Sequence, residues 1–307
     1  MELRQLRYFV QIADAGSVRT AATRVRIAQS ALSRQVAALE DELGVKLLER
    51  HARGVTPTHA GARLRARAVA ILSQIEDIRA EIMAEGDAPA GTATIGASAG
   101  ASRLLYGRLV EHFTDAYPQI KLNLVEGAPY LLLEGLDTGR IDLAVMVDPE
   151  PRPSLAFEPL ATEQVYLIGA LDDARLPAAS AQVSDLAELP LILLPRPAGS
   201  RMSFERAGAA AGVRLNVAYE IDNQDVTKDL IARGLGFGLL PYSTIERDVS
   251  RKGYAALPVD GLTLSRTLVS RGDHGATPAV ATLARVIRNL FNQLVEEQAF
   301  SGDIGAR

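Results

Sequence analysis

Residues 17–44 read SVRTAATRVRIAQSALSRQVAALEDELG and contain two amphipathic stretches separated by a short break. In the first stretch, Ser17 precedes apolar positions at helical spacing and is a favourable N-cap. These positions are Val18, Ala21, Ala22 and Val25. The second stretch, from about Gln29 to Leu43, repeats that spacing with larger side chains. The sequence therefore predicts two helices joined by a tight turn.

A further helix is predicted before this pair. Its apolar residues recur at i, i+3, i+4 and i+7, and Gly16 marks its C-terminal end. On the helix that begins near Gln29, the leucines and Val36 share one face, and polar side chains share a neighbouring face. The polar residues are Gln29, Ser30, Ser33 and Arg34. Arg can pair with guanine and Gln with adenine in the major groove, and Ser more often contacts phosphate. The pattern is typical of a DNA-binding helix-turn-helix; the alternative is an ordinary amphipathic surface helix.

Residues 45–61, VKLLERHARGVTPTHAG, have two short apolar pieces around a basic tip. This pattern predicts a β-wing, in which Arg50 and Arg53 contact phosphates or the minor groove. An Arg- and Gly-rich loop that is simply solvated is the alternative.

The run LRQLRYFVQIADAGSVRTAATRVRIAQSALSRQVAALEDELGVKLLER, followed by TPTHAG, resembles the N-terminal winged helix-turn-helix of LysR-type transcriptional regulators. The resemblance implies a DNA-binding domain over residues 1–58. Ala28 departs from the family pattern, which commonly has Ser just before the recognition helix. Losing that cap is expected to cost about 1 kcal/mol of local stability, without removing a base-contacting residue.

Composition and charge agree with a folded DNA-binding protein. The chain has 307 residues, 48% of them hydrophobic, and a net charge of −4. Residues 1–58, however, hold nine Arg or Lys against six Asp or Glu. The basic excess thus lies on the predicted DNA-binding part, and the acidic remainder should discourage non-specific DNA binding.

A long helix is predicted over residues 59–86, where apolar residues alternate at spacings of four and three. This seam consists of Leu64, Ala68, Ile71, Ile75, Ile78 and Ile82. Such a seam pairs with another helix, although an amphipathic helix lying on its own domain would show a similar pattern. The resemblance implies a linker helix that dimerises the DNA-binding heads. A dimer predicts an inverted-repeat operator, and the family commonly forms tetramers. Residues 87–91 are expected to form a hinge.

From residue 92 to 307, strand-like and helix-like segments alternate, which predicts βαβ units with a parallel sheet. We expect two α/β lobes, one of residues 92–160 and 266–300 and the other of residues 161–265. The pieces TATIGAS, YPQIKLNLVEG, GRIDLAVM and GLGFGLLP resemble the LysR effector domain, which implies a type 2 periplasmic-binding-protein fold. LPRPAGSR, AYEID and KDLIARGLGF are most similar to the branch of nitrogen assimilation control proteins. The predicted fold class is therefore mixed: a winged helix-turn-helix, a linker helix and a two-lobed α/β domain.

A ligand of this domain should lie between the lobes, where helix N-termini favour an anion. Candidate residues follow predicted strands or open predicted helices, and they are Ser98, Ser102, Arg196, Ser200 and Asn223. Arg196 can form a forked pair with a carboxylate. By the resemblance, Ala128 occupies a position where several family members carry a hydroxyl. The alternatives are helix capping by the serines and a surface position for Arg196.

Two other functions share some of these patterns. A two-lobed body also suits a solute-binding protein, but the N-terminus has no apolar signal segment and carries the DNA-binding motif. Gly96 to Gly100 matches the G-x-S-x-G of serine hydrolases, with Ser98 as nucleophile, yet no clear acid partner accompanies the later histidines. The glycines of GLGFG precede an apolar strand, so a turn is favoured over a phosphate loop.

The sequence thus predicts a non-enzymatic, cytoplasmic regulator that binds double-stranded DNA, a small effector such as a carboxylate, and itself. No metal is expected, because the chain has no Cys and only four scattered His. No cofactor and no membrane partner are predicted either.

Overall fold

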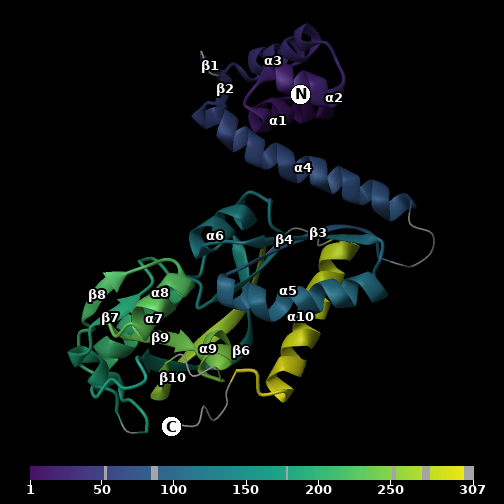
Figure 1. The fold of residues 1–307 in the computed structure, drawn as a ribbon. Coiled ribbons are helices and arrows are strands. Elements are labelled where there is room, and N and C mark those ends of the chain that lie inside the picture. Colours follow the sequence, from purple (N-terminus) through teal and green to yellow (C-terminus); the bar gives the residue numbers. More distant parts are fainter. Residues whose placement is uncertain (52–53, 84–88, 178, 251–253, 272–276, 301–307) are drawn as a thin grey trace.

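The computed structural model describes residues 1–51, 54–83, 89–177, 179–250, 254–271 and 277–300. A small helical head, formed by the first part of the chain, is followed by the long helix α4 (His59–Met83) and then by a larger α/β body (Figure 1).

The head contains three helices and a two-stranded antiparallel wing. The helices are α1 (Leu3–Ala15), α2 (Val18–Val25) and α3 (Gln29–Leu43), and the wing strands are β1 (Leu48–His51) and β2 (Gly54–Pro57). Ser17 caps α2 by accepting from the N–H of Thr20, and Gly16 ends α1 in the left-handed region. Phe9, Leu32 and Leu39 are fully buried at the centre of the head. These contacts fix α3 on α1 and α2 with one face outward.

Helix α4 begins by packing on the head that precedes it. Arg65 forms an ion pair of 2.5 Å with Asp14 of α1, and Leu64 packs against the head core. Ala68 is 0% exposed within that same core. This corrects the predicted dimer seam at Ala68, because a side chain sealed inside its own head has no surface left for a second chain. Ile71 is 38% exposed.

The predicted hinge, residues 87–91, lies partly outside the described residues, which resume at residue 89. Its last residue, Gly91, already belongs to the first strand of the body, β3 (Gly91–Ala97).

The body is built on a six-stranded mixed sheet with strand order β4-β3-β5-β10-β6-β9. The strands besides β3 are β4 (Ile120–Glu126), β5 (Leu143–Val147), β6 (Leu155–Gly169), β9 (Gly238–Pro241) and β10 (Ala255–Arg271). Strand β3 pairs in parallel with β4 and β5. Strands β6 and β10, which we call the crossing strands, pair antiparallel with each other along most of their length. The expected parallel sheet is therefore found only in part, because the crossing strands run in opposite directions.

The first lobe surrounds β3, β4 and β5. Helices α5 (Ala99–Ala116) and α10 (Pro278–Glu296) share a core with these strands. A separate core lies under α6 (Pro129–Asp137), where Leu132 and Leu136 are fully buried with Val269 of β10. The lobe thus draws on both ends of the body sequence.

The second lobe lies at the other end of the crossing strands (Figure 1). It contains the parallel pair β7 (Leu191–Leu193) and β8 (Val217–Glu220), a 3-10 helix (Val183–Glu188), and the helices α7 (Gly199–Ala210), α8 (Gln224–Ala232) and α9 (Tyr242–Ser250). Phe237 is fully buried at its centre. In helix α9, Tyr242, Ile245 and Val249 stand at i, i+3 and i+7, although the segment was not singled out as a helix from the sequence. The mixed fold class predicted from the sequence is confirmed.

Candidate functional site

Helix α3 presents a polar face to solvent. Gln29, Ser30 and Arg34 are exposed and Ser33 is half-buried, whereas Leu32 on the neighbouring face is 0% exposed. Among the described residues, Arg34 has no ion-pair partner. The predicted base-contacting side chains therefore lie together on one accessible face.

Helix α3 is tied to the wing by Glu40. Its Oε1 accepts hydrogen bonds from the backbone N–H groups of Leu47 at 2.8 Å and Leu48 at 3.1 Å. Its Oε2 lies 2.7 Å from Lys46 Nζ. Burial raises the pKa of Glu40, but Lys46 and the two N–H groups outweigh it and leave this pKa below its usual value. Sequence analysis missed Glu40, since a carboxylate near a helix end looks like a solvated residue.

The wing also contacts the turn before α2, because Val55 N–H donates to Gly16 O at 2.8 Å. Arg50 belongs to β1, and Arg53 lies outside the described residues.

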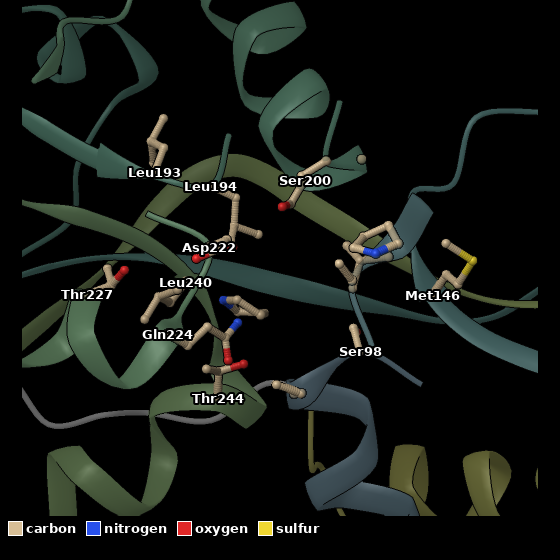
Figure 2. A pocket seen from close by; sticks show the side chains of 18 of the residues that line it. Ser98, Met146, Leu193, Leu194, Ser200, Asp222, Gln224, Thr227, Leu240 and Thr244 are labelled. Carbon is tan, nitrogen blue, oxygen red and sulfur yellow. The ribbon is translucent and has the colours of Figure 1, made fainter. Parts of the chain in front are cut away.

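A cavity of about 470 Å³ lies between the two lobes of the body. It is reached by residues from both lobes, among them Ser98 and Met146 of the first lobe and Leu193, Ser200 and Leu240 of the second (Figure 2). A volume of this size suits a small organic ligand.

The cavity wall is formed in part by the N-termini of three helices. Ser98, Ala128 and Ala198 are the N-caps of α5, α6 and α7, and no side chain accepts a cap hydrogen bond at any of the three. All three N-caps line the cavity. Free first-turn N–H groups at α5 and α7, and the positive end of each helix dipole, therefore favour an anion here. Helix α6 offers fewer such groups, because Pro129 has no N–H and Leu131 N–H donates to Ala128 O at 3.0 Å.

Five of the six residues predicted for effector binding line this cavity, namely Ser98, Ala128, Arg196, Ser200 and Asn223. Asn223 caps α8 by accepting from two backbone N–H groups. Ser102 does not line the cavity; its hydroxyl donates to Ala99 O at 2.9 Å and bonds to the Glu126 carboxylate. Arg196 is 65% exposed and holds Glu205 at 2.8 Å, so its guanidinium is already occupied at the rim.

The buried charge at the cavity is Arg266, which sequence analysis missed. Its Nε donates to Glu163 Oε2 at 2.7 Å, and its Nη2 donates to Ser243 Oγ at 3.1 Å. Ser243 N–H donates to the other Glu163 oxygen at 2.6 Å. The two charged side chains are 1% and 0% exposed. This pair joins both crossing strands to the start of α9, and no local sequence signal relates residues 103 positions apart.

Direct contacts connect the lobes across the cavity. Arg103 of α5 pairs with Asp225 of α8 at 2.9 Å, and Ser203 of α7 donates to Asp148 Oδ2 at 2.6 Å. Gly199 is required at the start of α7, because a Cβ there would lie 2.3 Å from Asp148 O. The lobes are therefore in close contact at the mouth of the cavity.

Comparison with known families assigns both parts of the chain. A family model described as "LysR substrate binding domain" matches residues 86–292, and one described as "Bacterial regulatory helix-turn-helix protein, lysR family" matches residues 3–62. The chain belongs to the LysR family. It is thus a DNA-binding transcriptional regulator with an effector-binding domain, as the sequence predicted.

Named relatives of this LysR regulator agree with that assignment. It is 31% identical to the nitrogen assimilation regulatory protein nac of Klebsiella aerogenes, over 95% of this chain and 96% of the relative. It is 30% identical to the HTH-type transcriptional regulator BbuR of Bordetella bronchiseptica, over 97% of this chain and 92% of the relative. The similarity to nac supports the predicted branch of the family. These relatives are regulators, not solute-binding proteins or hydrolases.

Solved structures share the architecture. A full-length OxyR variant from Pseudomonas aeruginosa superimposes with a TM-score of 0.74 at 25% identity, covering 95% of each chain. CbnR complexed with its target DNA gives a TM-score of 0.68 at 23% identity, covering 94% of this chain and 100% of that chain. None of the helices described in this LysR regulator is long and apolar enough to span a membrane.

Proposed function

We propose that this LysR regulator binds an inverted-repeat operator through the exposed face of α3. Gln29 and Arg34 contact base edges, Ser30 and Ser33 contact phosphates, and the wing arginines contact the backbone beside the groove. The observation that supports this assignment is the shared exposure of the polar face beside the buried Leu32. We place this function in the cytoplasm and assign it no catalytic step.

Two heads are brought together by α4 in this proposal. Ile71 and Ile75 continue the apolar repeat beyond Ala68 with side chains that are exposed and half-buried, respectively. The side chains of Ile78 and Ile82 lie outside the described ones, and their place in the seam remains a prediction. A homodimer, or a homotetramer of two such dimers, would present two recognition helices to two half-sites.

The effector in this proposal is a small carboxylate bound in the cavity between the lobes. The uncapped N-termini of α5, α6 and α7 are the observation that carries it. Ser98 and Ser200 add hydroxyls at two of these termini. Arg196 serves at most at the rim, because Glu205 already binds its guanidinium.

Effector binding would act on the contacts that already join the lobes. A ligand that fits the closed cavity better than the open one shifts the lobe equilibrium. That shift changes how the bodies pack against each other and therefore the spacing of the heads on DNA.

DNA binding is tested by selecting an operator in vitro and measuring its affinity by fluorescence anisotropy at fixed salt. Arg34→Ala should weaken operator binding by roughly tenfold or more and reduce discrimination against mutated half-sites. Arg4→Ala is the matched control, because Arg4 is exposed on the same head and pairs only weakly with Glu2, at 3.6 Å. Equal affinity and selectivity of Arg34→Ala and wild type would refute the assigned face.

A further inference from the structure

The inner end of the cavity carries two polar atoms that lack partners. Thr244 Oγ1 and Gln224 Oε1 are both buried, and neither has a hydrogen-bond partner among the described residues. Thr244 is only 7% exposed, and both residues line the cavity. Their side chains point toward one another (Figure 2). Buried polar groups without partners are costly, so native proteins keep few of them unless something binds there.

The surroundings hold these two groups in place. Lys228 Nζ donates to Thr244 O at 2.7 Å, which ties α8, the helix of Gln224, to α9, the helix of Thr244. A Cβ on Gly100 would lie 3.1 Å from Thr244 Oγ1 and 3.7 Å from Arg266 Nη2. Because Gly100 has no side chain, there is room between the start of α5 and these groups.

The charge of Arg266 does not make this end of the cavity an anion site. Glu163 binds its guanidinium at 2.7 Å, and both side chains are sealed from solvent, so the pair is neutral as a unit. Lys228 is turned to the Thr244 carbonyl and does not line the cavity. What faces a ligand is a hydroxyl that donates or accepts, an amide oxygen that only accepts, and the unused donors of a guanidinium. A second carboxylate cannot donate to Gln224 Oε1, whereas a neutral carboxamide can donate to it and accept from Thr244.

We propose that the inner end of the cavity, formed by Gln224, Thr244 and Arg266, is a subsite for an uncharged group that both donates and accepts hydrogen bonds. The inference rests on the proposed function, in which a carboxylate lies at the uncapped helix N-termini. The effector is therefore a monocarboxylate whose other end is a carboxamide or a group of the same hydrogen-bonding character. Apolar residues such as Leu193 and Leu240 also line the cavity (Figure 2).

Three probes of similar length test the chemistry: glutaramate with a terminal amide, glutarate with a second carboxylate, and hexanoate with an apolar end. Titration calorimetry on the full chain should show glutaramate binding about tenfold more tightly than either of the others. Thr244→Val and Gln224→Met should each weaken glutaramate binding about three- to tenfold and should not weaken hexanoate binding. Thr114→Val, a threonine on α5 outside the cavity, should change neither.

Stability provides an independent readout. Without ligand, Thr244→Val should keep or raise the thermal midpoint, because no hydrogen bond of that hydroxyl is lost. A clear fall in the midpoint would show that the hydroxyl has a structural partner and would overturn the proposal. Equal binding of glutaramate and hexanoate, or tightest binding of glutarate, would overturn the subsite and leave the proposed carboxylate function standing. Failure of all three probes to bind would overturn both.

Discussion

Replacing Glu40 with Ala should loosen the attachment of the recognition helix to the wing. The substitution removes the acceptor for two backbone N–H groups, those of Leu47, which is 1% exposed, and Leu48, which is half-buried. An unsatisfied buried donor costs about 1–3 kcal/mol, and a half-buried one recovers part of that from water. The Lys46 amine is 72% exposed, so its ion pair adds little. We therefore expect the head to lose about 2–4 kcal/mol of stability.

Hydrogen exchange measured on head peptides is the suitable assay, because unfolding of a chain with several parts is not a single transition. Glu42→Ala is the matched control: Glu42 is exposed, it lies two residues away, and its partner is the N-terminal amine. Its effect should stay below about 1 kcal/mol. Equal protection of the wing amides in Glu40→Ala and wild type, or an equal loss in Glu42→Ala, would refute the reasoning.

The same residue predicts a pH dependence. Because the folded state lowers the pKa of Glu40 below 4.5, its carboxylate stabilises the head above that pH, and the stabilisation is lost as pH falls through the lower folded value. The difference in head protection between wild type and Glu40→Gln should therefore be largest near neutral pH and shrink as the pH falls below 4.5 and through the lowered pKa of Glu40. A difference that grows on acidification would contradict the assigned hydrogen bonds.

Three further substitutions probe the body and the head. Arg266→Met should destabilise the body by about 3–5 kcal/mol in thermal or urea unfolding, because it leaves Glu163 buried without its partner. Replacing both residues by apolar ones should recover most of that loss; no recovery would mean that the loss comes from packing. Gly199→Ala should separate the lobes and lower the thermal midpoint, since its Cβ would overlap Asp148 O; an unchanged midpoint would show that α7 can shift freely. Ser17→Ala should cost the head about 1 kcal/mol of exchange protection through loss of the α2 cap. Unchanged protection would show that this cap does not stabilise the head.

The head was predictable because its signals are local. Helices α1, α2 and α3 each carry a clear 3.6-residue repeat, and Ser17 and Gly44 mark their ends within one residue. In the body, the alternation of segments predicted the kind of elements but not where each one begins; α5 begins at Ala99 and α7 at Gly199. Ala68 shows why the apolar repeat of α4 does not by itself predict dimer contacts. The same repeat can bury a residue against the head of its own chain.

The cavity was only partly predictable for a related reason. Ser98, directly after β3, and Ser200, in the first turn of α7, could be located from the alternation of strands and helices. Arg266 and Thr244 could not, because each is buried beside residues that are distant in sequence: Arg266 beside its partner Glu163, and Thr244 beside Gly100. Arg196 is among the residues that line the cavity, but its pairing with Glu205 depends on how α7 follows the preceding loop.

Because the chain leaves the first lobe, forms the second and then returns to the first, the cores of the two lobes are completed at different times during synthesis. The second-lobe core is drawn from one continuous stretch, Val165 to Leu264. The first-lobe core contains residues from both ends of the body sequence, from Ala93 to Phe300. On the ribosome, the second lobe can thus complete its core while the first still waits for α10, leaving the apolar faces of β3 and α5 exposed until synthesis is almost finished. Nascent chains truncated before α10 should accordingly be the ones that chaperones hold and proteases remove.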